Sequence, residues 1–293
     1  MRGMFRAFIA SALVLGLQGI APMPRAEAQT TTAARPAGGA ASQVTSHFTV
    51  VLPTQTADLR VQGEVFNATG TKREIETRPL EAGRAYEYTF VAEWTPNNYT
   101  VMTRARTVQF RGGGSMVVDL TAEAPTDRAK IRYVTTPDEV VDAMINLAGV
   151  TKSDVVFEPG CGDARITIAA VRAGARRGVG VDIDAVRVAD SQASVKSAGL
   201  QDRVEIRLGD ALDIKDLSDA TVVFLYMGDE FDVLLRPLLW RDLKVGARVV
   251  SHRFTMGDWK PDQTIDMIIE DGYHYLIHLW TITPEIKARV ARD

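Results

Sequence analysis

The sequence predicts an α/β fold, a parallel sheet built from βαβ units, preceded by a small all-β sandwich domain. Two observations support this prediction. Between residues 47 and 121, apolar residues alternate with polar ones at a period of two, which is typical of strands with one buried face. From residue 130 onward, short apolar runs alternate with helical patterns. We place the all-β domain at residues 46–122 and the α/β domain at residues 130–293.

The composition is that of an ordinary globular protein and excludes several classes. Of the 293 residues, 46% are hydrophobic and 24% are charged, which excludes a fibrous or wholly disordered chain. The formal net charge is -3 and no segment is a basic stripe, so we expect no nucleic-acid partner. Cys161 is the only cysteine, which excludes an intramolecular disulfide and a metal cluster held by several cysteines. The composition predicts no oligomeric state.

Residues 1–28 have the pattern of a secretory signal peptide. A basic start is followed by an apolar run over residues 7–21, and Ala26 and Ala28 suit a cleavage site. The run is shorter than the roughly 20 residues of a membrane span, so we expect no stable membrane span after cleavage. We therefore expect an exported protein, periplasmic or in the cell envelope, and a cytoplasmic one if the signal is not used. Residues 29–45 have the composition of a linker.

Short alternating runs predict about six strands in residues 46–122. The longest predicted strand, residues 86–94, puts its apolar side chains on one face. Residues 78–88 resemble the centre of small β modules in bacterial surface proteins, in particular a short domain common in exported planctomycete proteins. The resemblance implies location rather than chemistry, and the segment contains no catalytic constellation. We interpret this domain as a structural or binding appendage.

The α/β domain is predicted to open with a helix that Thr136 caps and in which Pro137 takes the first position. The pattern that follows predicts strands at residues 154–158, 178–182, 204–208, 220–226 and 247–252, with a helix at 166–173. Two final alternating runs flank Asp271-Gly272, which predicts a two-residue hairpin and an antiparallel last strand.

A glycine-rich turn between the first of these strands and its helix carries the strongest functional signal. Glu158 precedes Gly160 and Gly162 there, and Asp182 ends the second strand 20 residues after Gly162. Such a turn lets a ligand approach bare backbone, and an acid at that distance can bind both hydroxyls of a ribose. A dinucleotide site would have a third glycine where Arg165 stands. The acid at Glu158 also favours the cationic S-adenosylmethionine over the pyrophosphate of NAD.

The ordered set of motifs at residues 158–163, 181–182 and 209–210 resembles that of class I S-adenosylmethionine-dependent methyltransferases, over residues 130–283. The resemblance implies a Rossmann-like, seven-stranded methyltransferase sheet and S-adenosyl-L-methionine as the cofactor. By this resemblance, successive motifs along the chain bind the methionine end of the cofactor, its ribose and its adenine amino group. Residues at the N-terminal helix close over the bound cofactor. The implied cofactor-binding residues are Glu158, Gly160 and Gly162 for the methionine end, Asp182 for the ribose, Asp210 for the adenine, and Tyr133 and Thr136 for the cover.

Further motifs resemble one branch of these enzymes, which includes the mitochondrial lysine methyltransferases of the ATP synthase c subunit and of the adenine nucleotide translocase. This resemblance implies a protein lysine as the methyl acceptor. Ala164 departs from the pattern, because the branch usually has glycine there. We expect alanine to fit, provided that the position keeps a helical conformation. The motifs lie at residues 133–137, 162–166, 237–239, 248–252 and 256–261.

The sequence assigns no catalytic residue, because methyl transfer needs alignment more than acid–base groups. Tyr226, Asp229 and Glu230 follow the fourth strand, where such enzymes place acceptor-site residues, but they equally suit the start of a helix. His252, at the end of the fifth strand, has the same standing. Two functions from other classes stay open: an exported, non-catalytic surface or envelope protein with a vestigial Rossmann-like domain, and an NAD-linked oxidoreductase.

Three residues with reactive side chains are interpreted as structural. His274 and His278 share a face of the last predicted strand, where lone histidines are usually structural, so we expect no metal site. Cys161 lies inside the glycine turn and is interpreted as a small packing residue and not as a nucleophile.

Overall fold

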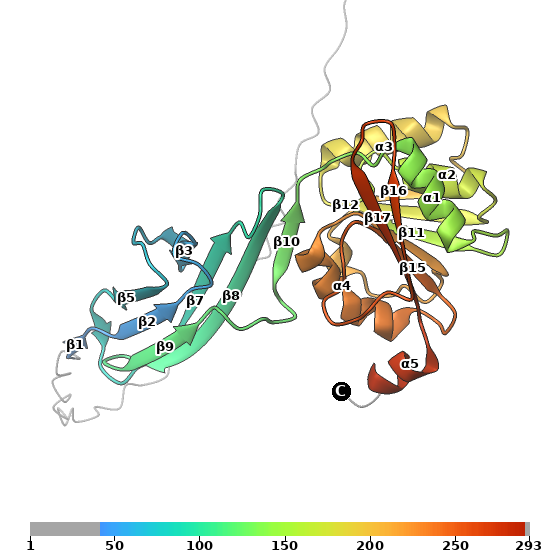
Figure 1. Cartoon of the computed structure of the whole chain (residues 1–293). Helices are drawn as coiled ribbons and strands as arrows, with labels where there is room; N and C mark the ends of the chain where they lie inside the picture. Colours follow the sequence, from blue (N-terminus) through green and yellow to red (C-terminus); the bar gives the residue numbers. More distant parts are fainter. Residues whose placement is uncertain (1–41, 291–293) are drawn as a thin grey trace, which may run out of the picture. The chain divides into compact units, whose positions relative to one another are not determined.

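The computed structural model describes residues 42–290 (Figure 1). The predicted signal peptide at residues 1–28, and most of the predicted linker at 29–45, lie outside the described residues. Within residues 42–290, no helix is both long enough and apolar enough to cross a membrane.

The N-terminal part is an all-β region. Its strands are β1 (Gln43–Val44), β2 (His47–Val51), β3 (Asp58–Val61), β4 (Glu64–Val65), β5 (Lys72–Glu76), β6 (Leu80–Glu81), β7 (Ala85–Trp94), β8 (Thr100–Arg111), β9 (Ser115–Asp119) and β10 (Arg128–Ile131). They form a two-stranded sheet β1–β6, a three-stranded sheet β5–β2–β9 and a five-stranded sheet β10–β8–β7–β3–β4. The region has more strands than predicted, because β1, β4 and β6 are too short to leave a periodic pattern.

One apolar core joins the three-stranded and five-stranded sheets. Phe48 on β2 contacts Phe90 on β7 and Phe110 on β8, with ring centroids 5.1 and 4.9 Å apart. Leu59 on β3 and Val118 on β9 are buried in the same cluster. The residues that alternate in the sequence therefore face inward, as predicted.

The strand β10 ends this region and pairs antiparallel with β8, with Ile131 opposite Thr100. Residues 130–131, which the sequence places at the start of the α/β domain, thus lie in a strand of the five-stranded sheet. Just before β10, a buried ion pair joins Arg104 Nη2 to Asp127 Oδ2 at 2.6 Å. Loss of either partner would leave an uncompensated buried charge, so this pair fixes where the chain turns into β10.

The C-terminal part contains a seven-stranded sheet, which confirms the predicted Rossmann-like architecture. Its strands are β11 (Val155–Pro159), β12 (Arg177–Asp182), β13 (Val204–Leu208), β14 (Val222–Leu225), β15 (Arg248–His252), β16 (Gln263–Ile268) and β17 (His274–Thr281). Their order is β13–β12–β11–β14–β15–β17–β16. Strand β17 pairs antiparallel with β15 and β16, and the other pairs are parallel.

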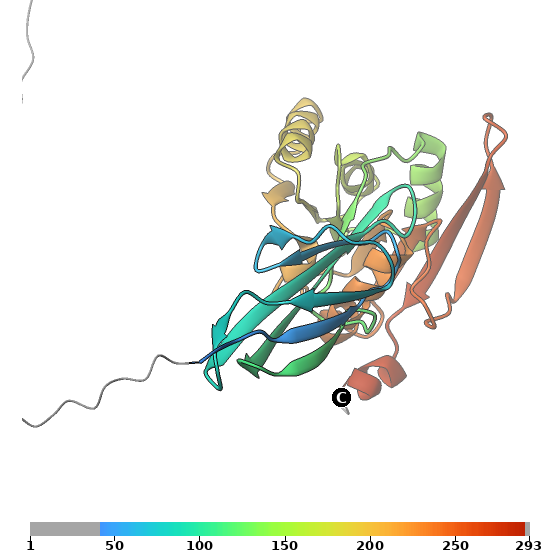
Figure 2. The same ribbon diagram turned by 90° about the vertical axis from the view of Figure 1, so that its left-hand side faces the viewer.

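Helices cover both faces of this sheet. The first face packs against α1 (Asp138–Ala148), α2 (Arg165–Arg172) and α3 (Ala185–Ser197), in a core that includes Met144 and Val195. The second packs against α4 (Asp229–Asp242) and α5 (Pro284–Val290), in a core that includes Leu235 and Trp280. The turned view shows the β16–β17 hairpin at one edge of the sheet (Figure 2).

The turn of this hairpin is longer than predicted. Ile268 pairs with His274, so residues 269–273 form the connection in place of the two-residue turn Asp271-Gly272. Within it, the Gly272 N–H donates to Ile269 O at 2.9 Å, and Gly272 has a φ of +78°. The antiparallel last strand is confirmed, whereas the two-residue turn is wrong. The alternating pattern continues to residue 270 and resumes at residue 273, but β16 ends at Ile268 and β17 begins only at His274.

Candidate functional site

A pocket lies at the carboxyl ends of β11, β12 and β14, where ligands bind in α/β sheets. Its volume, including the part open to solvent, is about 940 Å³. The chain from Ala129 to Thr136 forms one wall of this pocket. Six of the seven predicted cofactor-binding residues line the pocket: Tyr133, Thr136, Glu158, Gly160, Asp182 and Asp210. The seventh, Gly162, lies in the glycine turn beneath Tyr133.

Close contacts require both glycines of the turn. Gly160 and Gly162 have φ values of +64° and +58°, a region that glycine adopts without strain. A Cβ on Gly160 would lie 2.0 Å from Met227 Sδ, and a Cβ on Gly162 would lie 2.2 Å from Tyr133 Cε2. Met227 and Tyr133 both line the pocket. A larger residue at either glycine would therefore displace a wall of the pocket.

Ala164 does not keep the helical conformation expected of it. Its φ of 62° and ψ of 18° are left-handed, which costs an L-residue roughly 1–2 kcal/mol. The expectation is wrong because α2 begins only at Arg165, so Ala164 still belongs to the turn. The fully buried Ala164 nevertheless donates its N–H to Cys161 O at 2.7 Å, which closes the turn.

Glu158 holds a buried carboxyl group at the pocket. Its Oε2 accepts a hydrogen bond from Thr167 N at 2.9 Å and another from the Thr167 hydroxyl. Burial, with a smaller contribution from the nearby carboxylates of Asp163 and Asp182, nevertheless raises the pKa of Glu158 to about 8. A cation bound beside Glu158 would lower this pKa and favour the ionised carboxylate, so the site suits a positively charged ligand group.

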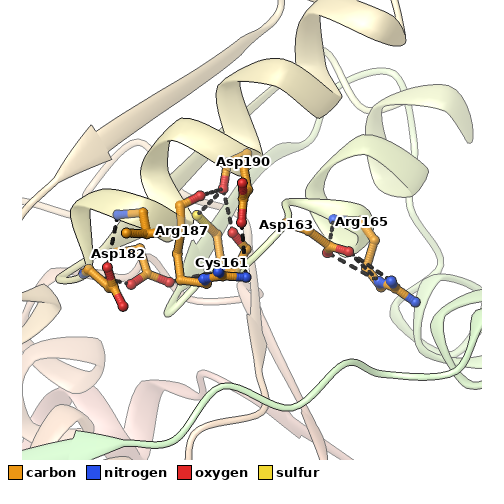
Figure 3. A network of polar contacts seen from close by, with 10 residues as sticks. Cys161, Asp163, Arg165, Asp182, Arg187 and Asp190 are labelled. Atoms are coloured by element: carbon orange, nitrogen blue, oxygen red, sulfur yellow. Dashed lines mark hydrogen bonds and ion pairs between the residues drawn. The ribbon is translucent and has the colours of Figure 1, made fainter.

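Asp182 ends β12, and backbone groups orient its carboxylate (Figure 3). Oδ2 accepts a hydrogen bond from Gly162 N at 3.0 Å, and Oδ1 accepts one from Asp184 N at 2.9 Å. Each carboxylate oxygen can accept a second hydrogen bond. Asp182 can therefore accept hydrogen bonds from two neighbouring hydroxyls, such as those of a ribose.

Asp163 and Arg165 connect the glycine turn to the chain around Thr136 in the wall of the pocket. The sequence did not suggest this role. Arg165 Nη2 lies 2.7 Å from Asp163 Oδ2 (Figure 3), and Arg165 Nη1 donates to Thr136 O at 2.9 Å. The guanidinium of Arg187 lies over the Tyr133 ring, 4.9 Å from its centroid. The Asp-x-Arg spacing beside the glycines was the available signal for this contact.

Thr136 does not cap α1. The helix begins at Asp138, its N-cap residue is Pro137, and no side chain forms a cap hydrogen bond there. The side chain of Thr136 is buried, and its Oγ1 lies 3.5 Å from His252 Nδ1. The predicted cap is wrong because Thr136 faces the end of β15.

Asp210 caps the 3-10 helix η1 (Ala211–Asp213), since its Oδ1 accepts from Leu212 N at 2.9 Å. Its Oδ2 lies 3.4 Å from Arg128 Nε on β10. Arg128 Nη2 also lies 2.7 Å from Asp213 Oδ1. The strand β10 therefore brings a cation to this end of the pocket, a contact that depends on the fold and leaves no local pattern in the sequence.

Aromatic rings gather beside the pocket at the ends of β14 and β15. Tyr226, which lines the pocket, stacks on His252 with ring centroids 4.0 Å apart and on Phe254 at 5.6 Å. Burial lowers the pKa of His252 to about 4, so its imidazole is neutral at pH 7. Burial also raises the pKa of the Tyr226 phenol, which stays protonated. The sequence pattern pointed to Tyr226 and His252 but not to Phe254.

Asp229 and Glu230 begin α4, and both make hydrogen bonds that position other segments. Asp229 Oδ1 accepts from Thr255 N at 2.8 Å and from the Thr255 hydroxyl at 2.9 Å. Glu230 Oε1 accepts from Asn97 Nδ2 at 3.1 Å. In this structure the two acids therefore act as anchors for neighbouring loops.

The remaining candidate side chains have structural surroundings. Cys161 Sγ lies 3.6 Å from Ser191 Oγ, and burial raises the pKa of its thiol, which stays protonated. His278 Nδ1 lies 2.8 Å from Thr264 Oγ1, and His274 is exposed. Over residues 42–290 we find no group of three or more His, Cys, Asp or Glu side chains that could hold a metal ion.

The chain is similar to known methyltransferases. The family model of the ANTKMT methyltransferase domain matches residues 158–263. A protein-lysine N-methyltransferase of Saccharolobus islandicus (strain REY15A) is 36% identical over 154 residues, which cover 52% of this chain and 94% of that protein. The adenine nucleotide translocase lysine N-methyltransferase of Mus musculus is 27% identical over 151 residues, 52% of this chain and 65% of that protein.

Among solved structures, an RNA methyltransferase from Salinibacter ruber in complex with S-adenosyl-L-homocysteine is 45% identical, with a TM-score of 0.48. That match covers 52% of this chain and 95% of the Salinibacter chain. Each of these matches leaves about half of the present chain uncovered.

The matched segment 158–263 contains the glycine turn, the carboxylates of Asp182 and Asp210, and the aromatic rings beside the pocket. The buried carboxyl groups of Glu158 and Asp182 suit the cationic, ribose-bearing S-adenosylmethionine. With a 36% identical relative matched over nearly its whole length, the conclusion is that this chain belongs to the ANTKMT methyltransferase family and is an S-adenosylmethionine-dependent methyltransferase.

Proposed function

We propose that this enzyme transfers a methyl group from S-adenosylmethionine to a lysine side chain of a protein. The observation that carries the proposal is the 36% identity to a protein-lysine N-methyltransferase over 94% of that protein's length. The lysine methyltransferase of Mus musculus, at 27% identity, supports the same acceptor class.

We further propose how the cofactor binds. The ammonium group of its methionine end lies against Glu158, since this carboxyl group is buried beside the glycine turn. The ribose hydroxyls bind Asp182, whose oxygens are oriented by two backbone N–H groups. Asp210 accepts the adenine amino group, and Tyr133 and Thr136 cover the cofactor from the wall of the pocket.

The neighbours of the pocket suit an amine acceptor. The cofactor supplies a methyl group on a sulfonium, and the lysine nitrogen must be neutral when its lone pair forms the new bond to carbon. The carbon–sulfur bond then breaks, and its electron pair stays on sulfur. Tyr226 and His252 are neutral at pH 7 and add no positive charge, so a lysine can enter and lose its proton to solvent beforehand.

The proposal is tested by radioactive methyl transfer. Purified protein is incubated with tritiated S-adenosylmethionine and, separately, with the protein fraction and the RNA fraction of a bacterial extract. We expect label in the protein fraction, on lysine after acid hydrolysis, and none with the variant Asp182→Ala. Label confined to RNA would refute a lysine acceptor and would match the activity named for the Salinibacter protein.

The two alternatives from the sequence give different results in this assay. A non-catalytic surface protein would label neither fraction, and nothing in the comparisons supports that alternative. An NAD-linked oxidoreductase would bind NAD in calorimetric titration, whereas we expect binding of S-adenosylmethionine and S-adenosylhomocysteine only.

We also propose that the chain is exported, on the charge and apolar pattern of residues 1–28. A reporter enzyme that is active only outside the cytoplasm, fused after residue 30, tests this. We expect activity with the native segment and none when the apolar run 7–21 is interrupted by two aspartates. An inactive native fusion would refute export.

A further inference from the structure

The turn between β7 and β8 lies beside the aromatic rings at the pocket. Tyr99, the last residue before β8, contacts Phe254 with ring centroids 5.3 Å apart. Phe254 in turn stacks on Tyr226, which lines the pocket. Tyr99 Cε2 also lies 3.4 Å from where a Cβ on Gly228 would be. A row of rings therefore runs from the all-β region to the pocket.

Hydrogen bonds hold this turn in place. Glu230 at the start of α4 accepts from Asn97 Nδ2 at 3.1 Å and from the Thr100 hydroxyl at 3.3 Å. Asn97 Oδ1 accepts from the N–H groups of Tyr99 and Thr100, at 3.1 and 2.8 Å. The N–H of Arg132, in the wall of the pocket, donates to Tyr99 O at 2.8 Å. The backbone on both sides of the Tyr99 ring is thus fixed to the methyltransferase region.

We propose that Tyr99 is an acceptor-binding residue: its ring forms the outer part of the opening through which the lysine reaches the methyl donor, so the all-β region helps to select the acceptor. This inference rests on the proposed function for the identity of the acceptor. It gives the all-β region a part in the reaction in place of the appendage role that the sequence suggested.

The chemistry of the row suits a lysine side chain. The apolar stem of lysine packs well on aromatic faces, and its ammonium group is attracted to them. Of the three rings, those of Tyr99 and Tyr226 are half-buried and can contact an incoming side chain, and Tyr226 lines the pocket. Phe254 is buried and contacts both, so it holds the two tyrosine rings in place. Besides burial, the negative charges of Glu230 and Asp229 raise the pKa of the Tyr99 phenol and would attract an ammonium group, whereas Arg253 lowers that pKa and would repel one.

The test compares Tyr99→Ala with Tyr99→Phe and with Asn98→Ala, a substitution of the exposed neighbour in the same turn. Initial rates with tritiated S-adenosylmethionine are measured against the concentration of the fraction that the wild-type enzyme labels. We expect Tyr99→Ala to raise KM about tenfold and to leave kcat unchanged, because the lost ring would contact the acceptor in the opening and does not line the cofactor pocket. Tyr99→Phe and Asn98→Ala keep the wild-type KM.

Two further measurements separate this result from unfolding. The affinity of Tyr99→Ala for S-adenosylhomocysteine should equal that of the wild type, although its Tm should fall because the contact between Tyr99 and Phe254 is lost. Tyr99→Leu keeps an apolar side chain at this position and should also retain the affinity for S-adenosylhomocysteine. An unchanged KM in Tyr99→Ala, or the same rise in Asn98→Ala, would overturn the inference.

The outcome for the acceptor class is read separately. If the wild type labels RNA only, the lysine proposal fails, whereas a tenfold rise in KM for RNA in Tyr99→Ala would still support a part for Tyr99 in the opening. A wild-type enzyme that binds S-adenosylhomocysteine and labels neither fraction would overturn both.

Discussion

The affinity for the cofactor should depend on pH through Glu158. Burial raises the pKa of Glu158 to about 8, so the carboxyl group of the empty pocket is protonated at pH 7. The ionised fraction that can bind an ammonium group is about one hundredth at pH 6 and about one tenth at pH 7. Because the apparent Kd varies inversely with the competent fraction, the affinity should increase about tenfold between pH 6 and pH 7.

The direction follows from the two states of the carboxyl group. Its pKa is raised in the empty pocket and lowered by a bound ammonium group, so binding releases a proton, and the affinity rises with pH until pH passes about 8. Calorimetric titration with S-adenosylhomocysteine, in two buffers of different ionisation enthalpy, measures both Kd and the protons released. In this interval the α-amino group of the ligand, with a pKa of about 8, stays mostly charged.

Two variants identify the group that titrates. Glu158→Gln should bind more weakly at pH 7 and show no change in Kd between pH 6 and pH 7. Glu139→Gln, which changes an exposed carboxylate in the first turn of α1, should keep the wild-type slope. A wild-type Kd that is equal at pH 6 and pH 7, or a slope that survives in Glu158→Gln, would refute the reasoning.

Three further substitutions have defined outcomes. Asp182→Ala should weaken S-adenosylhomocysteine binding at least about 100-fold in calorimetry, since hydrogen bonds to a charged group contribute about 1.5–3 kcal/mol each; a Kd within threefold of wild type would show that the ribose binds elsewhere. Asp127→Asn should lower the free energy of unfolding in urea by about 3 kcal/mol, because it leaves the buried charge of Arg104 unpaired; a loss below about 1 kcal/mol would contradict this. Ala164→Val should lower the free energy of unfolding in urea by about 2 kcal/mol or more, because a β-branched residue does not tolerate a φ of 62°. The control Ala173→Val, at an exposed position with a right-handed helical conformation, should lower it by less than about 1 kcal/mol.

The parts of the site that the sequence predicts are those that local chain geometry sets. A strand such as β11, buried along its whole length, leaves a continuous apolar run, and its βαβ unit places Glu158, the glycines and Asp182 at one edge of the sheet. For the same reason, the order of motifs along the chain was enough to predict the pocket. Alternation likewise predicted the inward face of β7, where each second residue packs on the core.

The remaining contacts join residues far apart in the chain, and no local pattern encodes them. Asn97 and Glu230 are 133 positions apart, and Arg128 reaches Asp210 only because β10 pairs with β8. The conformation of Ala164 was misjudged for a related reason. A left-handed φ is imposed by the closed turn around it, and alanine itself carries no preference for that region.

The strand β10 has a thermodynamic consequence, because Ala129 and Ile131 line the pocket while β10 is hydrogen-bonded to β8. We therefore expect a ligand that fills the pocket to bind more tightly to molecules in which β10 is in place. At a ligand concentration of one hundred times Kd, detachment of β10 should cost up to about 2.7 kcal/mol more than in the absence of ligand. Backbone amides of β8 that face β10 should exchange hydrogen with solvent up to about 100-fold more slowly once the pocket is filled, so the all-β region senses the occupancy of the pocket through β10.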